Sequence, residues 1–240
     1  MATTIPNCIS YDPTYSYELA TIISSGMKRM FEDGDNVFYY ITTMNENYVH
    51  PDMPEGVEEG IVRGLYPLKK STKKGKKRVQ LMSAGTIMRE VEAAAVMLEK
   101  DYGVAADIWS MTSVNELARD GHKVSRRNMM NPAEEPEVPY VTQCLSPTEG
   151  PIIAATDYIR AHTNQIREFM PRSFTVLGTD GFGRSDTRAQ LREFFEVDRR
   201  YVVLAAMTTL ADGGVVSLAD VAKVMTDLGI DPAKPDPTTV

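Results

Sequence analysis

The chain has 240 residues, of which 42% are hydrophobic and 25% are charged, and this composition excludes a disordered or fibrous protein. No apolar run approaches the roughly 20 residues of a membrane span, and the N-terminus has neither the basic nor the apolar region of a secretory signal. We therefore expect a cytoplasmic globular protein without a membrane partner, long enough for one large or two smaller cores.

The first 66 residues predict a strand, a helix and a second strand, followed by a short helix. The expected strands are 8–10 and 37–41, and the expected helices are 13–34 and 55–65. Asp12 is a natural N-cap with Pro13 at the first helical position, and Gly34 is expected to end that helix. A parallel sheet cannot be built from so few strands. We expect the end of a larger domain that exposes apolar surface unless an upstream segment or another chain covers it.

A lysine-rich tract, Lys69–Arg78, carries six lysines and one arginine and leaves the remaining residues strongly acidic. It lacks the aromatic residues and spread of arginines with which nucleic-acid-binding proteins contact bases, so we expect no nucleic-acid partner. The simplest interpretation is a solvated linker between two domains. Docking of an acidic partner on the tract is the alternative.

After the tract, strands and helices alternate to the end of the chain. The expected strands are 79–82, 104–111, 140–144, 152–155 and 174–177. The expected helices are 87–100, 113–119, 157–169, 191–195, 201–210 and 217–228, and 120–139 is expected to be a loop. Asp157, Asp198 and Ser217 are the expected caps of their helices, and Trp109 is expected to be a packing residue. The alternation predicts an α/β fold with a doubly wound, mostly parallel sheet of about five strands.

The segment Gly178–Asp186 joins the last expected strand to a helix. Ligands of open α/β sheets bind outside the carboxyl ends of strands, so a site is expected here first. Its glycines permit a tight backbone path, and Ser185 or Asp186 can cap the following helix. The commoner role of such glycines is only to close a turn. Their spacing is not G-x-G-x-x-G, and the D-G-F-G sequence at 180–183 is not the kinase D-F-G motif.

Four residues are candidates for proximity to a site: His50, Asp180, Arg184 and Asp186. The last three can together hold an anion or a polar substrate, although an Asp180–Arg184 ion pair that fixes the loop is the interpretation we prefer. His50 lies in a loop where it is free to meet a ligand, whereas His162 lies on an apolar helix face and is expected to be a packed core residue. No nucleophile signature, Walker loop or H-E-x-x-H motif is present.

No metal site is expected from the cysteines. Cys8 and Cys144 are far apart, form no C-x-x-C motif and, with only three histidines in the chain, cannot build a typical zinc site. We expect both to be small buried hydrophobic residues.

Five longer segments are specific enough to indicate a family. They are Thr4–Pro13, Tyr39–Tyr48, Met53–Ile61, Glu116–Gly121 and Leu177–Asp186. These segments resemble the C-terminal part of the bacterial homodimeric pyruvate dehydrogenase family, the thiamine-diphosphate-dependent, decarboxylating first component of the pyruvate dehydrogenase complex. The resemblance runs from Thr3 to the C-terminus. It implies the end of a middle, pyrimidine-binding α/β domain at 1–66, a lysine-rich linker at 67–78 and a transketolase-type C-terminal domain at 79–240.

The resemblance implies that thiamine diphosphate and magnesium serve the intact enzyme and are bound by residues outside this segment. The family's diphosphate-and-magnesium motif and its activating glutamate match no position here. In the family, the cofactor attacks pyruvate, carbon dioxide leaves, and the two-carbon unit passes to the lipoyl group of the acetyltransferase component. The implied partners are a second copy of the chain, the acetyltransferase component and pyruvate. The segment itself is expected to be scaffold and dimer contact, with no catalytic, cofactor-binding or metal residue, and inactive alone.

A second function stays open. The chain would then be a free-standing binding or assembly module in which the loop at 178–186 holds a small anionic effector. Coding sequence upstream of Met1 that continues in frame with a cofactor motif would favour the enzyme segment over this module.

Overall fold

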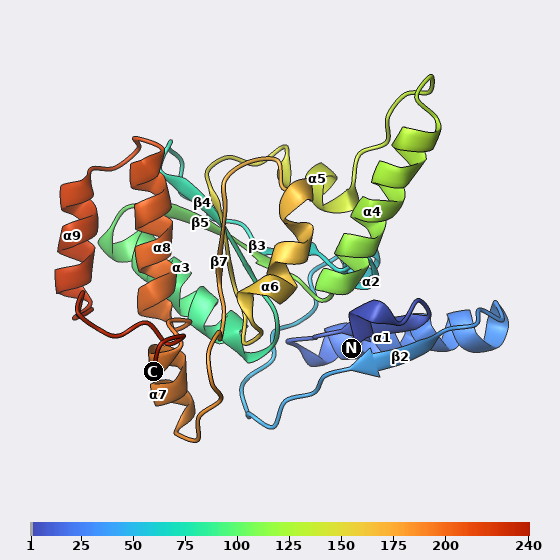
Figure 1. Ribbon diagram of the computed structural model, residues 1–240, viewed down its shortest axis with the longest axis horizontal. Helices are drawn as coiled ribbons and strands as arrows, with labels where there is room; N and C mark the ends of the chain where they lie inside the picture. The colour runs from blue at the N-terminus through green and yellow to red at the C-terminus, as the bar shows by residue number, and fades with distance from the viewer. Residues whose placement is uncertain (1) are drawn as a thin grey trace.

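The computed structural model describes residues 2–240 and contains two sheets (Figure 1). The large sheet has five strands in the order β3-β5-β4-β6-β7, and the small sheet pairs β1 with β2 in parallel. The strands are β1 Cys8–Tyr11, β2 Phe38–Ile41, β3 Tyr66–Lys69, β4 Arg78–Ser83, β5 Ala105–Ser110, β6 Ile152–Ala155 and β7 Phe174–Leu177. Strands β4 to β7 are parallel and β3 is antiparallel to β5, so the expected mostly parallel five-stranded sheet is confirmed.

Helices follow most of the strands. The α-helices of the described residues are α1 Ser16–Met27, α2 Glu58–Arg63, α3 Met88–Asp101, α4 Val114–Met130, α5 Tyr140–Leu145, α6 Arg160–Thr163, α7 Arg188–Phe194, α8 Arg199–Asp212 and α9 Leu218–Asp227. Shorter turns are η1 Ala2–Thr4, η2 Lys28–Glu32, η3 Gly85–Ile87 and η4 Asn164–Phe169. Within residues 2–240, no helix has the length and apolar character needed to cross a membrane.

Helices cover both faces of the large sheet, as in a doubly wound fold (Figure 1). Successive residues of β4 point to opposite faces, so Leu81 packs in the core beneath α3 and α8, whereas Met82 packs in the core beneath α4 and α5. Both side chains are fully buried. A parallel strand covered on two sides tends to be a continuous apolar run, which is why β6 was predictable from sequence.

Two expected elements of the C-terminal half are wrong. Residues 140–144 form the helix α5 and not a strand, because Val141 and Leu145 are the buried positions and their spacing is helical. Helix α4 continues to Met130, through a stretch expected to be loop, because Val124 still packs while the polar residues around it face solvent. The fifth strand is β3, which the sequence reading placed largely in the linker.

The expected caps are partly confirmed. Asp198 accepts hydrogen bonds from the first turn of α8, and Ser217 forms a capping box with Asp220 at the start of α9. Asp157 is not a cap, because α6 begins only after Ile159. The Trp109 indole is buried and donates to the Gln80 side-chain oxygen at 2.8 Å, as expected of a packing residue.

Asp12 does not cap the first helix, which begins four residues later at Ser16. Glu18 performs the capping by accepting the Tyr15 backbone N–H at 2.9 Å, and it also accepts the Thr14 N–H. The Asp12 carboxylate instead accepts hydrogen bonds from the hydroxyls of Thr42 (2.8 Å) and Tyr158 (2.7 Å). Asp12 thereby joins the N-terminal part of the chain to the segment after β6.

The Glu18 carboxylate is fully buried where the N-terminal part meets the large sheet. Besides the two backbone groups of its own helix start, it accepts the Tyr66 hydroxyl of β3 and the Ser110 hydroxyl of β5, each at 2.6 Å. Burial raises the pKa of Glu18 above its ordinary value, and the four hydrogen bonds counteract this only in part.

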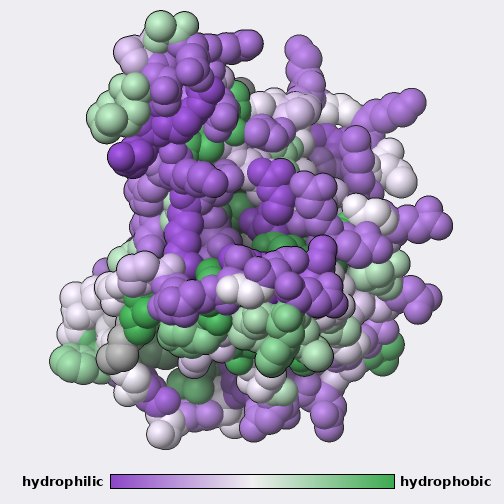
Figure 2. All heavy atoms as spheres, turned by 90° about the vertical axis from the view of Figure 1, so that its right-hand side faces the viewer, coloured by the Kyte–Doolittle hydropathy of each residue, from purple (hydrophilic) through white to green (hydrophobic). Residues whose placement is uncertain are grey.

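The N-terminal part exposes large apolar side chains, which confirms the expectation from its short sheet. They are Ile23, Met27, Phe31, Phe38 and Tyr40, with Phe31 78% exposed. A groove of about 1030 Å³ runs between α1, η2 and α2 beside them. Apolar side chains gather over the lower half of the face drawn in Figure 2, where this part of the chain lies.

The lysine tract generates a first prediction. Residues 70–77 form no regular element, whereas Lys69 lies in β3 and Arg78 in β4, where it pairs with Asp107 at 2.6 Å. Brief trypsin digestion is expected to cut first after Lys74, Lys76 or Lys77. The two products should co-elute on native size exclusion, because the ladder between β3 and β5 still joins them.

Mass spectrometry of the first products checks this expectation. The variant in which Lys70, Lys73, Lys74, Lys76 and Lys77 are all replaced by Gln is the matched control and should resist cleavage in this segment. First cuts within 79–228 in the parent chain would show that the domain boundary lies elsewhere.

The second prediction follows from Glu18. Because its folded-state pKa is raised, the folded protein keeps a proton that the unfolded chain loses above pH of about 4.5. The stabilisation from this site is therefore complete below the ordinary pKa and is lost as pH rises toward the raised value. The unfolding free energy of the parent chain, relative to Glu18→Gln, should fall with rising pH by up to about 1.4 kcal/mol per unit.

Urea unfolding at a series of pH values measures this difference, with the exposed Glu32→Gln as the control. A difference that stays constant or rises with pH contradicts the assignment of a raised pKa.

Candidate functional site

The loop at 178–186 follows β7 at the carboxyl edge of the parallel strands. Strand β4 lies between β5 and β6, so the chain leaves β4 toward one side of the sheet and leaves β6 toward the other, to β7. Such a reversal is the topological switch point at which open α/β sheets bind ligands. The structure thus places the expected loop beside the expected kind of crevice.

A crevice of about 400 Å³ opens at this point. Arg184, Arg188 and Arg192 are among the residues that line it, and its apolar lining includes Ile87 and Phe195. These residues come from the turn after β4, the loop after β7, and α7 with its C-terminal end. The cavity is therefore assembled from segments about 100 residues apart, and no local motif marks it.

The preferred Asp180–Arg184 ion pair is wrong. Asp180 pairs with the Arg160 side chain and accepts the Arg160 backbone N–H at 3.1 Å. The backbone brings them together, because the Thr179 N–H donates to the Tyr158 carbonyl at 2.9 Å. Arg184 turns the other way and lies over the Phe194 ring at 4.0 Å. Asp180 and Arg184 therefore belong to different sides of the loop.

The expected cap of α7 is also wrong, by one or two positions. The cap is Thr187, whose hydroxyl accepts the Gln190 backbone N–H at 3.4 Å. Asp186 instead accepts the Thr187 N–H at 2.7 Å, and it is exposed. Asp186 thus fixes the residue that caps the helix.

Gly181 has a structural requirement that is visible in the fold. Its φ is +109°, and an added Cβ would lie 2.4 Å from the Pro237 carbonyl oxygen. The C-terminal tail therefore packs directly on this loop. Gly181 is therefore required by its positive φ and by the close approach of the tail, while it also lines the crevice.

A network of charged side chains beside the crevice, centred on the buried Glu90 and the half-buried Glu46, was not predicted. Glu46 accepts from Arg192 at 2.8 Å and also pairs with Arg89, and Glu90 pairs with Arg192 at 3.2 Å and Arg199 at 2.8 Å. Burial opposes ionisation of Glu90, but the Arg199 hydrogen bonds and the arginine charges outweigh it and hold the pKa of Glu90 below its ordinary value. The network fixes the loop after β2 against α3, α7 and α8.

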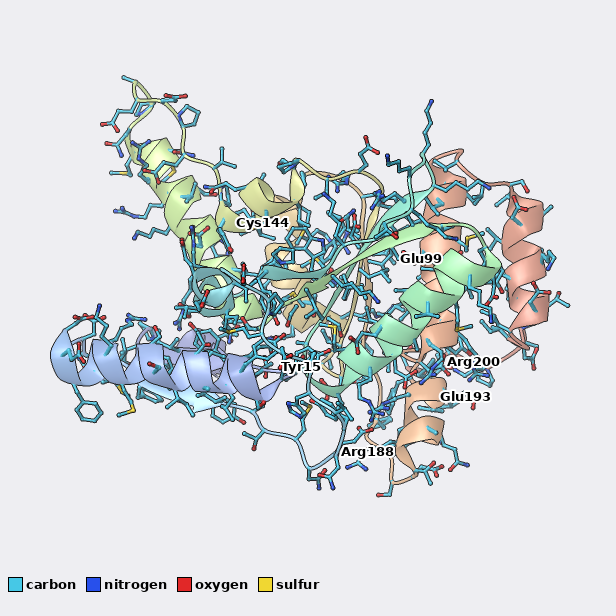
Figure 3. All side chains as sticks on the ribbon, turned by 180° about the vertical axis from the view of Figure 1, so that it is seen from behind. Tyr15, Glu99, Cys144, Arg188, Glu193 and Arg200 are labelled. Atoms are coloured by element: carbon cyan, nitrogen blue, oxygen red, sulfur yellow. The ribbon has the colours of Figure 1, made fainter. Side chains whose placement is uncertain are left out.

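Arg188 is the member of α7 nearest that loop. Figure 3 shows it projecting near the loop after β2, and its guanidinium donates to the Asn45 side chain at 2.7 Å. The two residues are 143 positions apart in sequence. No sequence signal connected them, although Asn45 lies within one of the segments that carry the family resemblance.

The histidines have structural partners. The His50 Nδ1 accepts the Ser16 backbone N–H at 2.8 Å, and its ring stacks on Tyr48 with centroids 4.7 Å apart. His50 therefore supports the start of α1 and lies away from the crevice. His162 is half-buried against Tyr158, with centroids 4.5 Å apart, and burial lowers the pKa of its imidazole. It packs less deeply than expected.

Cys8 is buried as expected and Cys144 is half-buried. Among residues 2–240, no three His, Cys, Asp or Glu side chains come together in a group that could hold a metal ion. The chemistry that the crevice offers is thus recognition of negative charge by guanidinium groups.

Two family models match the chain. The transketolase-like TK C-terminal domain matches residues 64–198, and the pyruvate dehydrogenase E1 component middle domain matches residues 1–51. The first begins just before β3 and ends just before α8, so it contains the entire large sheet. The second contains both strands of the small sheet.

Curated relatives match almost the full length of this chain. The pyruvate dehydrogenase E1 components of Cupriavidus necator and Pseudomonas aeruginosa are each 53% identical, covering 98% and 99% of it. That of Escherichia coli K12 is 50% identical over 98% of it. The matches cover only 26%, 27% and 26% of these relatives, so the chain spans about a quarter of their length.

Solved structures support the fold. A transketolase from Leishmania mexicana aligns with a TM-score of 0.61 at 15% identity, covering 88% of this chain and 26% of that one. A split-gene transketolase, described as an inactive beta4 tetramer, aligns with a TM-score of 0.55 at 17% identity, covering 88% and 60%. The chain therefore belongs to the transketolase-like TK C-terminal domain family, and it is similar over nearly its whole length to about a quarter of the length of bacterial pyruvate dehydrogenase E1 components, including part of their middle domain.

Proposed function

We propose that this chain serves as scaffold and dimer contact within a thiamine-diphosphate-dependent pyruvate dehydrogenase of the bacterial cytoplasm. The observation that carries the proposal is the 53% identity to E1 components over nearly the whole chain. The intact enzyme decarboxylates pyruvate and passes the acetyl unit to the lipoyl group of an acetyltransferase component. Its partners are a second copy of itself and that acetyltransferase.

Thiamine diphosphate with magnesium supplies the electron-accepting chemistry of the intact enzyme. The described residues do not fit that group, because a magnesium-held diphosphate requires convergent oxygen ligands and residues 2–240 contain no group of three or more suitable acidic side chains. Hence no catalytic step is assigned to this segment. Its contribution is to hold neighbouring parts of the enzyme in place.

Two features support a scaffold role. The charge network of Glu46 and Glu90 and the buried Glu18 fix the middle-domain end against the C-terminal domain. The apolar side chains of α1, η2 and β2, led by Phe31, stay uncovered in the isolated segment. A two-stranded sheet needs further strands for stability, so we assign this surface to the remainder of the middle domain and to the second subunit.

The segment division proposed from sequence fits this role. Residues 1–66 form the middle-domain end, 67–78 the connection and 79–240 the C-terminal domain. The first residues of the connection belong to the edge strand β3, which pairs with β5. The connection is therefore part of the large sheet at its start.

The third prediction tests the proposal. Titration calorimetry of the 240-residue chain with thiamine diphosphate and magnesium is expected to give no saturable isotherm at micromolar concentrations, and the chain should release no carbon dioxide from pyruvate. The physical reason is that the ligands for diphosphate and metal lie outside it.

The intact Pseudomonas aeruginosa E1 component serves as the positive control. Its matching segment is 53% identical to this chain. A micromolar isotherm for the 240-residue chain would refute the scaffold role.

A further inference from the structure

The switch-point crevice carries an excess of positive charge in a chain whose net charge is −7. Three arginines line it, Arg184, Arg188 and Arg192, against the single carboxylate of Asp157. A concave site with charges of one sign concentrates the field and attracts ligands of the opposite sign. This local imbalance runs against the composition of the chain as a whole.

Two of the three guanidinium groups have donors to spare. Arg192 is fully engaged by Glu46 and Glu90 and is only 13% exposed. Arg188 is 53% exposed, and its nearest carboxylate oxygen, on Glu46, is 3.6 Å away. Within residues 2–240, the Arg184 guanidinium lies over the Phe194 ring at 4.0 Å and forms no ion pair.

The rest of the crevice suits an anion with an apolar body. Ile87 from the turn after β4 supplies apolar lining, and so do Leu191 and Phe195, which lie on the same side of α7 as Arg188. On the loop side, an added Cβ at Gly183 would meet nothing within 4 Å, so the backbone there is open to approach. The volume of about 400 Å³ lies within the range of small-molecule sites, which is roughly 300–1,000 Å³.

We propose that this crevice binds a small organic phosphate, whose phosphate group is held by Arg184 and Arg188 and whose apolar part lies against Phe195 and Leu191. A phosphate matches two forked guanidinium groups because it offers several acceptor oxygens and close to two negative charges. The site depends only on residues of this segment.

Phenyl phosphate is the probe that combines both features, a phosphate and an apolar ring. Calorimetric titration of the 240-residue chain at constant ionic strength should give saturable binding with a dissociation constant below about 1 mM. Benzyl alcohol, which keeps the ring and lacks the charge, should show none. Arg184→Gln and Arg188→Gln should each weaken phenyl phosphate binding about tenfold or more.

Arg126→Gln is the matched control, because Arg126 is an exposed arginine on α4, remote from α7 (Figure 1). Circular dichroism verifies that each variant is folded. Arg184→Gln keeps the test decisive if Arg188→Gln disturbs the contact with Asn45, since within residues 2–240 Arg184 takes part in no ion pair and lies over the Phe194 ring. The proposal is overturned by absence of saturable binding, by binding that Arg184→Gln leaves unchanged, or by an equal loss in Arg126→Gln.

Discussion

The buried carboxylate of Glu18 fixes the N-terminal part of this chain to its large sheet. Burying a carboxylate away from water is costly, and four donors, two of them the hydroxyls of Tyr66 and Ser110, offset that cost in part. Those hydroxyls belong to β3 and β5, whereas the carboxylate belongs to α1. The interaction can form only when both parts of the chain are folded, so it makes the middle-domain end depend on the C-terminal domain for its position.

Much of the fold could be predicted because a strand that is buried on both faces of a sheet is a short apolar run in the sequence. Residues 152–155 and 174–177 are short apolar runs bounded by turn residues, and both are strands. Residues 140–144 have the same appearance, yet they form a helix because their buried positions are four apart. A short apolar run alone therefore does not distinguish a strand from a helix. Strand β3 was missed because its pairing with β5, some 40 residues later, is what makes it a strand.

The position of the crevice could be predicted from the sequence, but the contacts of its charged residues could not. A glycine-containing loop after a strand indicated the carboxyl edge of the sheet, and the crevice lies there. The predicted ion pair within the loop was wrong. Asp180 pairs with Arg160, which is 20 residues away, and within residues 2–240 Arg184 forms no ion pair. Arg192 of α7 donates hydrogen bonds to Glu90 and Glu46, which lie more than 100 residues earlier in the sequence. Pairings over such separations depend on the fold and carry no local pattern.

Native-state hydrogen exchange tests the central claim, that the Glu18 contacts make the two parts of the chain one cooperative unit. In the parent chain, the amides of α1 should exchange with nearly the same opening free energy as those of β4. Glu18→Ala leaves four buried donors without an acceptor, so it should lower the protection of α1 by about 3 kcal/mol while the exposed Glu32→Ala changes little. Amides of α1 that already exchange far faster than those of β4, or that ignore Glu18→Ala, would contradict the account.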